Sequence, residues 1–298
     1  MDQKQIQREL QALRYSLVEN LYPQKKNCMF CGRYWFGNKL SAGLCPHCLL
    51  KWRLYRQNTR ICPLCGSFDC GDPCQGPCAG YASQHSSPMG SLTAIYAASP
   101  YIGVYRQRVL TLKYNGQKQM AASLAFLMAE TWREGEDKRQ RNGLQHAGIN
   151  HSGTQVLKQL VMGLYRGAAR TQPCLVPVPM HRDKEKKRGY NQSFLLALAV
   201  SRETGLPVKE LLSRPYPGQM QEGLDKWQRQ KALDKVFQWS GVAQDSKPGP
   251  AIIIDDVVTT GATLETCGEI LRSRGYGPVW GLTFAGGVAA GERQIIPV

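Results

Sequence analysis

The sequence predicts an α/β protein in which a parallel sheet is preceded by a small metal-binding module. An apolar run that leads through a polar loop into an amphipathic helix, as in 251–274, is typical of a parallel sheet. The cysteines gather at the other end, since nine of the eleven lie between Cys28 and Cys78. The 298 residues leave room for one sizeable domain and one smaller module.

The first 24 residues are predicted to form a short helix, because Ile6, Leu10, Leu13 and Leu17 share one face before Pro23. No signal-peptide core and no run of about 20 apolar residues is present, so a cytoplasmic location is expected. The formal net charge of +16 indicates a polyanionic partner, and nucleic acid is the obvious candidate. The alternative is a basic enzyme that binds small phosphorylated substrates.

Residues 25–80 are predicted to form a double zinc ribbon, because paired Cys-x-x-Cys turns each aim two thiolates at one point. The ligands of the first site would be Cys28, Cys31, Cys45 and Cys48. Those of the second would be Cys62, Cys65, Cys74 and Cys78, although Cys70 could replace either of the last two. Four cysteines close the coordination shell, so the zinc would be structural. Disulfides are the alternative, and a cytoplasmic location argues against them.

The same module interleaves basic and aromatic side chains, which fits a nucleic-acid contact. They are Arg33, Lys39, Lys51, Arg53, Arg56 and Arg60, with Tyr34, Trp35, Trp52 and Tyr55. The alternative is that the aromatic residues fill the small core of the ribbon, which is what we expect of Trp35.

After a Ser/Gly/Pro-rich linker over 81–90, the second domain is predicted over 90–298. A hairpin is expected from strands at 92–97 and 101–105, followed by helices at 106–114 and 118–132. The charged segment 133–154 is expected to be a flexible insertion. The remaining predicted elements are a helix at 156–165, a strand at 174–179 and a helix at 192–203.

The segment 251–263 is the most informative part of the chain. A buried strand over Ala251–Ile254 would end at Asp255 and Asp256, and a loop rich in threonine would lead into a helix over 264–274 with Gly275 as its C-cap. Free N–H groups and the helix dipole favour phosphate at such a loop. The two carboxylates suit the diol of an attached ribose, or a Mg²⁺ ion near it. The alternative is a solvated turn, but adjacent acids at the end of a buried strand are costly without a partner.

A second candidate anion site follows the strand at 174–179. The loop from Met180 is basic and leads to Gly189 and a helix start at Gln192. Arg188, Asn191 and Gln192 border that helix start and are the stronger candidates, whereas any single lysine of the run can simply be solvated.

Segment 251–263 resembles the phosphoribosyl-pyrophosphate (PRPP) signature of type I phosphoribosyltransferases. Together with Val176-Pro-Val-Pro-x-His181, Arg188-Gly-Tyr-Asn-Gln192 and Leu112-Lys113-Tyr114-x-Gly116, it resembles the ComF family of late-competence proteins. Gln221, Leu224, Arg229 and Phe237 fit a later motif of that family. Three features depart from it: the segment 133–154 is longer than expected, Ala232 stands where the family usually has Asn, and the second zinc site is irregular.

The resemblance implies a Rossmann-like type I phosphoribosyltransferase fold behind an N-terminal zinc ribbon. It implies a role in natural transformation, handling internalised single-stranded DNA together with the competence helicase and DNA-processing proteins. The alternative is an active phosphoribosyltransferase that transfers ribose 5-phosphate from PRPP, with Mg²⁺, to a nucleobase or an amine.

The implied site has two parts. Asp255 and Asp256 are the candidate catalytic residues, because they would orient the ribose hydroxyls. The candidate phosphate-binding residues are Val258, Thr259, Thr260, Gly261, Ala262, Thr263, Arg188, Asn191, Gln192 and Lys113.

Overall fold

The computed structural model describes residues 26–35, 42–69, 90–146, 172–216, 236–240 and 248–288. The chain divides into two compact units, one of Met1–Asn58 with Pro297–Val298 and the other of Thr59–Ile296. The predicted helices over 1–24 and 156–165, and the cysteines Cys70, Cys74 and Cys78, lie outside the described residues. The division after Asn58 differs from the predicted module over 25–80, because the Cys62–Cys65 pair belongs to the larger unit.

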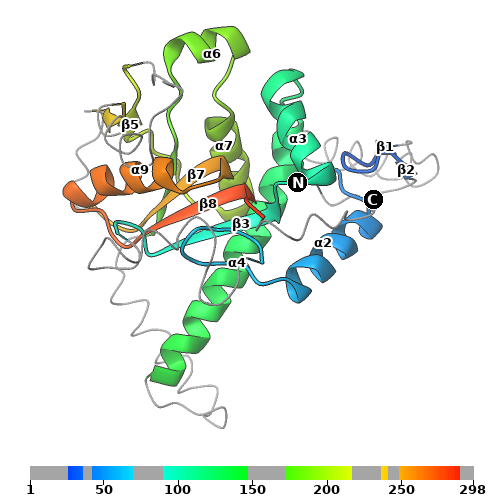
Figure 1. Cartoon of the computed structure of the whole chain (residues 1–298), viewed down its shortest axis with the longest axis horizontal. Helices are drawn as coiled ribbons and strands as arrows, with labels where there is room; N and C mark the ends of the chain where they lie inside the picture. The colour runs from blue at the N-terminus through cyan, green and yellow to red at the C-terminus, as the bar shows by residue number, and fades with distance from the viewer. Residues whose placement is uncertain are drawn as a thin grey trace, which may run out of the picture. The chain divides into compact units, whose positions relative to one another are not determined.

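In the described part of the smaller unit, two short strands form a hairpin that precedes helix α2 (Figure 1). The hairpin pairs β1 (Lys26–Asn27) with β2 (Tyr34–Trp35), and helix α2 is Pro46–Asn58. Proline suits the first position of α2, where its missing N–H has no partner to lose. Trp52, at 1% exposure, and Phe30 are buried in this unit, whereas Trp35 is only partly buried. The prediction that Trp35 fills the core is therefore not met.

The larger unit is built on a parallel sheet in the order β3-β8-β7-β4 (Figure 1). The strands are β3 (Ala94–Pro100), β8 (Val279–Gly286), β7 (Ala251–Val258) and β4 (Cys174–Pro177). Every residue of β8 is buried, as expected of a central strand covered on both faces. Val208 forms a parallel bridge to Leu175, so the chain adds one more short stretch beyond β4. The expected Rossmann-like α/β fold is confirmed.

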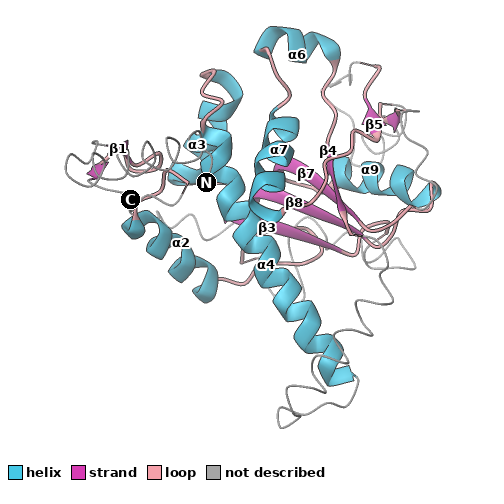
Figure 2. Cartoon of the chain, turned by 180° about the vertical axis from the view of Figure 1, so that it is seen from behind, coloured by secondary structure: helices cyan, strands magenta, loops and turns pink. Residues whose placement is uncertain are grey.

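Helices cover both faces of this sheet (Figure 2). Helices α4 (Met120–His146) and α7 (Gln192–Thr204) pack on each other and on one face. Helix α9 (Ala262–Ser273) covers the opposite face, where its Leu264 lies against Gly281 of β8. Helices α3 (Gly103–Tyr114) and α6 (Arg182–Arg188) stand near the carboxyl ends of the strands, and β5 (Leu212–Ser213) pairs with β6 (Gln238–Trp239).

Three predicted elements differ from the structure. The expected hairpin at 92–105 is the single strand β3 followed by α3, because β3 pairs in parallel with β8, far along the chain. The expected insertion begins instead as the second half of α4, which continues to His146. Its charged residues support a helix, as in the ion pair of 2.6 Å between Arg133 and Glu130.

The third difference is the expected basic loop after β4, which contains helix α6. His181 caps its start by accepting a hydrogen bond from the N–H of Asp183, and Gly189 ends it at φ +77°. Acidic residues lie in its first turn and basic residues in its last, as the helix dipole favours. No residue of α6 is buried, so no apolar periodicity marks it in the sequence.

Candidate functional site

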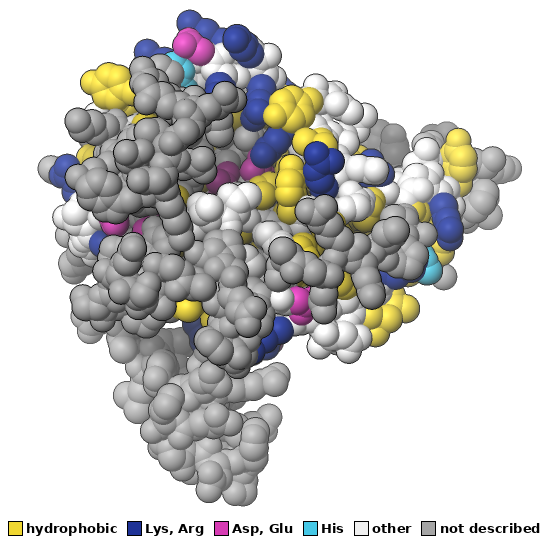
Figure 3. Space-filling view, in the orientation of Figure 1, with side chains coloured by type: hydrophobic (Ala, Val, Ile, Leu, Met, Phe, Trp, Pro, Cys, Tyr) yellow, Lys and Arg dark blue, Asp and Glu magenta, His cyan; other side chains and the backbone are white. Residues whose placement is uncertain are grey.

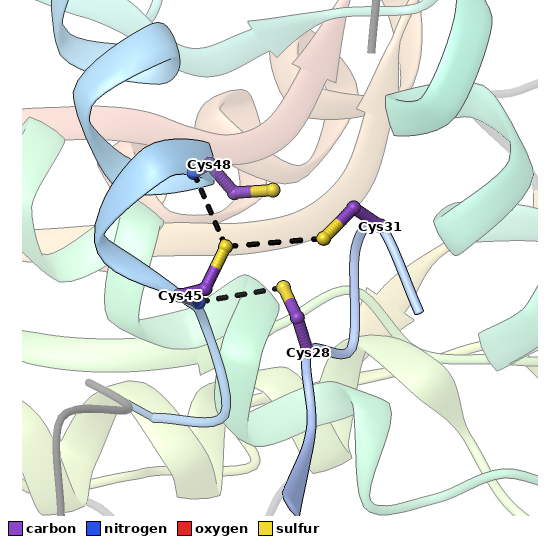
Figure 4. Close-up of side chains that lie close together, drawn as sticks. All are labelled: Cys28, Cys31, Cys45 and Cys48. Atoms are coloured by element: carbon purple, nitrogen blue, oxygen red, sulfur yellow. Dashed lines mark hydrogen bonds between the residues drawn. The ribbon is translucent and has the colours of Figure 1, made fainter. Parts of the chain in front are cut away.

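Four cysteines of the smaller unit form a cluster of metal-ligating atoms (Figure 4). Cys28 and Cys31 come from the turn between β1 and β2, whereas Cys45 and Cys48 come from the start of α2. Their sulfur atoms all lie within 4.8 Å of one another and point toward a common centre. These are the four ligands predicted for the first zinc site.

The spacing of these sulfur atoms fits zinc. A tetrahedron with Zn–S bonds of about 2.3 Å has S···S edges of about 3.8 Å, and Cys31 Sγ lies 3.8 Å from Cys45 Sγ. The backbone N–H of Cys45 donates to Cys28 Sγ at 3.3 Å, and that of Cys48 donates to Cys45 Sγ at 3.5 Å. Such bonds stabilise thiolates, the form that binds metal. With four protein ligands the ion would have no open position, so its role would be structural.

Crowding shifts the pKa values of these thiols in opposite directions. A hydrogen bond from Cys48 lowers the pKa of Cys28 to about 4, and the same bond raises the pKa of Cys48 above its usual range. Without a cation only part of the cluster ionises, so a metal ion would displace the remaining protons.

The Cys62–Cys65 pair makes a tight turn that packs on the larger sheet. The N–H of Gly66 donates to the carbonyl of Cys62 at 2.8 Å, and the N–H of Ile95 in β3 donates to the carbonyl of Pro63 at 2.7 Å. Gly66 fits closely, since a Cβ there would lie 2.9 Å from side-chain atoms of Ile95 and Val258. A hydrogen bond to Cys62, with burial, raises the pKa of Cys65 to about 12. Cys74 and Cys78 lie outside the described residues, so the second zinc site stays a prediction.

The second candidate site lies where the strand order reverses. The connection from β4 runs through α7 to the outer stretch at Val208, whereas the connection from β7 runs through α9 on the other face to β8. In open α/β sheets, ligands bind outside the carboxyl ends of the strands at such a switch point. Figure 3 shows acidic side chains beside lysine and arginine side chains near the middle of this face.

Asp255 and Asp256 lie inside β7 rather than after it. The strand continues to Val258 because β8 supplies a partner throughout, as in the pairing of Val258 with Gly286. Strand β4 ends earlier, at Pro177, and a proline cannot donate to a ladder. The two carboxylates are therefore presented beyond the end of β4, at the switch point.

Asp255 is partly buried and accepts a hydrogen bond of 2.8 Å from the hydroxyl of Ser193, at the start of α7. The backbone N–H of the next residue, Asp256, donates to the same Asp255 oxygen at 2.9 Å. Burial, followed by the charge of Asp256, raises the pKa of Asp255 to about 7. A carboxyl group shifted in this way is typical of functional sites.

Asp256 is 4% exposed and pairs with Lys113, whose Nζ lies 3.0 Å from Oδ2. Lys113 comes from the last turn of α3, so this ion pair ties α3 to the end of β7. The hydroxyl of Tyr190 also donates to the carbonyl of Leu112, which ties the end of α3 to the segment before α7. The structure thus brings Lys113 to the acid pair.

The loop 259–261 leads from β7 into α9. Gly261 takes φ +82° as the N-cap residue, and it has no side chain that could accept from the N–H groups of the first turn. Thr259 and Thr260 are exposed, and the hydroxyl of Thr260 accepts from the N–H of Ala262 at 3.4 Å. An uncapped helix start of this kind offers free N–H groups to an anion.

The other end of α9 closes in a Schellman motif at Gly275 (φ +83°), where the N–H of Tyr276 donates to the carbonyl of Leu271.

Residues 188–192 have mixed roles. Arg188 donates to Gln192 Oε1 at 3.0 Å, and its guanidinium lies 5.0 Å from the centroid of the Tyr114 ring. The side chain of Asn191 caps α7, accepting from the N–H of Ser193 at 3.0 Å, and donates to the carbonyl of Val178 at 3.0 Å. Because these bonds engage both ends of the amide, Asn191 positions the helix start.

The sequence did not single out Arg214, which follows β5. Burial lowers the pKa of Arg214, and the charge of Asp255 opposes that shift. Its Nε has no hydrogen-bond partner among the described residues. Burial, with the charges of Arg214 and Arg188, also lowers the pKa of Lys184. Cations that crowd in this way favour an anion between them, but a lone arginine after a short strand carries no signal in one sequence.

Comparison with known proteins gives relatives along much of the chain, although no family model matches. The chain is 30% identical over 139 residues to "Competence protein F" of Haemophilus influenzae, covering 44% of this chain and 61% of that protein. It is 25% identical over 238 residues to "DNA utilization protein YhgH" of Salmonella typhi, covering 80% of this chain and 87% of that protein. It is 31% identical over 106 residues to "Competence protein ComFC" of Bacillus subtilis, covering 34% of this chain and 39% of that protein.

The fold and the two sites define a Rossmann-like α/β protein with an N-terminal four-cysteine cluster of the zinc-ribbon type. Within that class, the relatives named competence protein F, competence protein ComFC and DNA utilization protein support assignment to the ComF family. Among the residues that the structure describes, no helix is long and apolar enough to cross a membrane.

Proposed function

We propose that this protein acts in competence, handling internalised single-stranded DNA, and that its switch-point site binds PRPP or a nucleotide-like 5-phosphate. The observation that carries the proposal is the acid pair in β7, which lies directly before a threonine loop and an uncapped helix start. The names of the relatives, competence proteins and a DNA utilization protein, support the biological role.

Each part of the site suits one part of a sugar phosphate. Asp255 and Asp256 would accept hydrogen bonds from the ribose hydroxyls, and the loop from Val258 to Thr263 would donate N–H groups to the 5-phosphate. Arg188 and Arg214 would neutralise the diphosphate. Mg²⁺ prefers oxygen ligands, and the carboxylates fit an ion that arrives with PRPP, where it would offset the negative charge of the diphosphate.

The alternative, an active phosphoribosyltransferase, draws on the same geometry. Transfer from PRPP needs mainly orientation of the ribose and stabilisation of the departing diphosphate. Lys113 pairs with Asp256, Arg214 interacts with the charge of Asp255, and Lys184 of α6 lies near Arg214. This gathering of cations favours the chemistry. The acceptor would be a nucleobase or an amine.

The proposed partners are single-stranded DNA, the competence helicase and DNA-processing proteins, in the cytoplasm. The +16 charge supports a polyanionic partner. If DNA binding is largely electrostatic, its affinity will fall steeply as salt rises.

Calorimetric titration of PRPP with Mg²⁺ tests the site. We expect binding by the parent and none by Asp255→Asn/Asp256→Asn, with Asp137→Asn as the control because that exposed acid lies on α4, away from β7. A folded parent that binds no PRPP would contradict the proposed site. Release of pyrophosphate with a defined acceptor would establish the transferase alternative, whereas salt-dependent binding of single strands would support DNA handling.

A further inference from the structure

Tyr114, the last residue of α3, has a side chain that is 67% exposed. An exposed tyrosine means little by itself, because single apolar groups are common on protein surfaces. Its surroundings are what make it informative.

The ring of Tyr114 is held from one side by Arg188. The guanidinium carbon lies 5.0 Å from the ring centroid, and Nη2 donates to the tyrosine hydroxyl at 3.4 Å. Arg188 is itself fixed by its bond of 3.0 Å to the buried Gln192. An aromatic ring that is oriented by a cation and still largely exposed can stack a second flat group at little entropic cost.

The ring also stands beside the switch-point site. Its neighbour Lys113 reaches Asp256 at 3.0 Å, so the end of α3 is anchored at the acid pair. Lys118, just beyond α3, lies 5.1 Å from the centroid of the Tyr190 ring. An open ring beside a cation, with further lysines near the same end of α3, resembles the arrangement by which single-stranded nucleic acid is held, with bases on aromatic faces and phosphates on cations.

A second group of rings in the larger unit shows the contrast. Tyr96, Trp132 and Trp280 surround a cation, but that cation is Arg139 of the chain itself, whose guanidinium lies 4.3 Å from the Trp132 centroid. Those faces are already occupied, whereas most of Tyr114 is open.

We propose that Tyr114 is a stacking platform for a nucleobase of a bound single strand, oriented by Arg188. This inference rests on the proposed function and names the base contact that the switch-point site lacks. Stacking on an aromatic face tolerates every base, so the platform would hold DNA without regard to sequence.

The test measures the binding of a labelled single strand by fluorescence anisotropy, for the parent, Tyr114→Ala, Tyr114→Phe and the control Tyr216→Ala, which removes another exposed tyrosine of the same unit. We expect Tyr114→Ala to weaken binding about tenfold, and the other two variants to stay within about twofold of the parent. The same titrations with a strand that contains abasic sites should remove the difference between the parent and Tyr114→Ala, because no base is left to stack.

The outcomes separate this inference from the function on which it rests. A parent that binds no single strand would overturn the DNA-handling proposal. A parent that binds well, with Tyr114→Ala equal to it, would overturn the stacking platform alone. A difference between the parent and Tyr114→Ala that persists on the abasic strand would also overturn it, because the contact would then not be with a base.

Discussion

At the scale of single residues, the carboxyl group of Asp255 occupies a position that disfavours its ionised form. Burial and the charge of Asp256 raise its pKa, and together they outweigh the hydrogen bond from Ser193, which favours the carboxylate. The folded protein therefore holds a proton on Asp255 up to a pH of about 7, whereas the unfolded chain releases it near the ordinary pKa of 3.8. The raised pKa makes the folded protein less stable at neutral pH, but it keeps a carboxyl group at the site that a ligand can contact.

The variant Asp255→Asn should be more stable than the parent at pH 8, and this difference in stability should be smaller at pH 5. Between pH 3.8 and about 7 the folded parent binds one more proton than the unfolded chain, so its stability falls as the pH rises. One pKa unit corresponds to about 1.4 kcal/mol, which moves the unfolding midpoint by roughly 3 °C in a domain of this size. Thermal unfolding at both pH values measures the stability difference, with Asp137→Asn as the control. A difference that does not change with pH would contradict the raised pKa of Asp255.

Arg214 offers a second prediction at this scale. If its partly buried guanidinium faces the bound phosphates, Arg214→Gln should weaken PRPP binding about tenfold, since a hydrogen bond to a charged group is worth about 1.5–3 kcal/mol. The exposed Arg202, at the end of α7, provides a matched control as Arg202→Gln. Equal affinities for both variants would show that Arg214 serves packing alone.

At the scale of secondary structure, elements marked by local signals could be predicted and those defined by distant partners could not. The β7–α9 unit and α7 carry their apolar periodicity, caps and glycines within a few residues, and the structure has them within a few residues of the expected bounds. The partner strand of β3 lies far along the chain: Tyr96 pairs with Leu282, 186 residues later. Such a pairing forms only in the folded protein, and no local pattern encodes it. Helix α6 has no buried face, so its charge pattern and caps were the only signals.

The same distinction applies to the site. The acid pair and the threonine loop are contiguous in the sequence, so they could be singled out together. Ser193 and Arg214 approach Asp255 only through the fold, and Asn191 was expected at the phosphate because a single sequence cannot separate a helix cap from a ligand.

The cap role of Asn191 can be tested directly. Asn191→Ala should lower the free energy of unfolding by about 1 kcal/mol, because the N–H groups of Ser193 and Phe194 lose their acceptor. Asn191→Ser keeps a capping oxygen and should recover much of that loss. Urea unfolding gives both values. If instead both variants unfold like the parent and lose PRPP binding equally, Asn191 is a ligand rather than a cap.

At the scale of the whole molecule, metal binding and phosphate binding belong to different units. The cluster from Cys28 to Cys48 lies in the smaller unit, and every described residue of the switch-point site lies in the larger one. A four-cysteine zinc site supplies much of the folding free energy of a small module. Removing the metal with a chelator, or the variant Cys28→Ser, should therefore abolish hydrogen-exchange protection in α2 and leave α7 protected. Cys174→Ser, a buried change in β4, should leave α2 protected.

The two cysteine pairs should differ in their effect on the phosphate site. Cys28→Ser should leave PRPP affinity within about twofold of the parent, because no described ligand candidate lies in its unit. Cys62→Ser should weaken PRPP binding, because it places a hydroxyl at a buried position of the turn that seats Gly66 against Val258, where the phosphate loop begins. Calorimetry on both variants, each checked for folding of the larger unit by its thermal transition, decides the matter. Equal losses of PRPP affinity would mean that the first metal site also supports the phosphate loop, against the division drawn here.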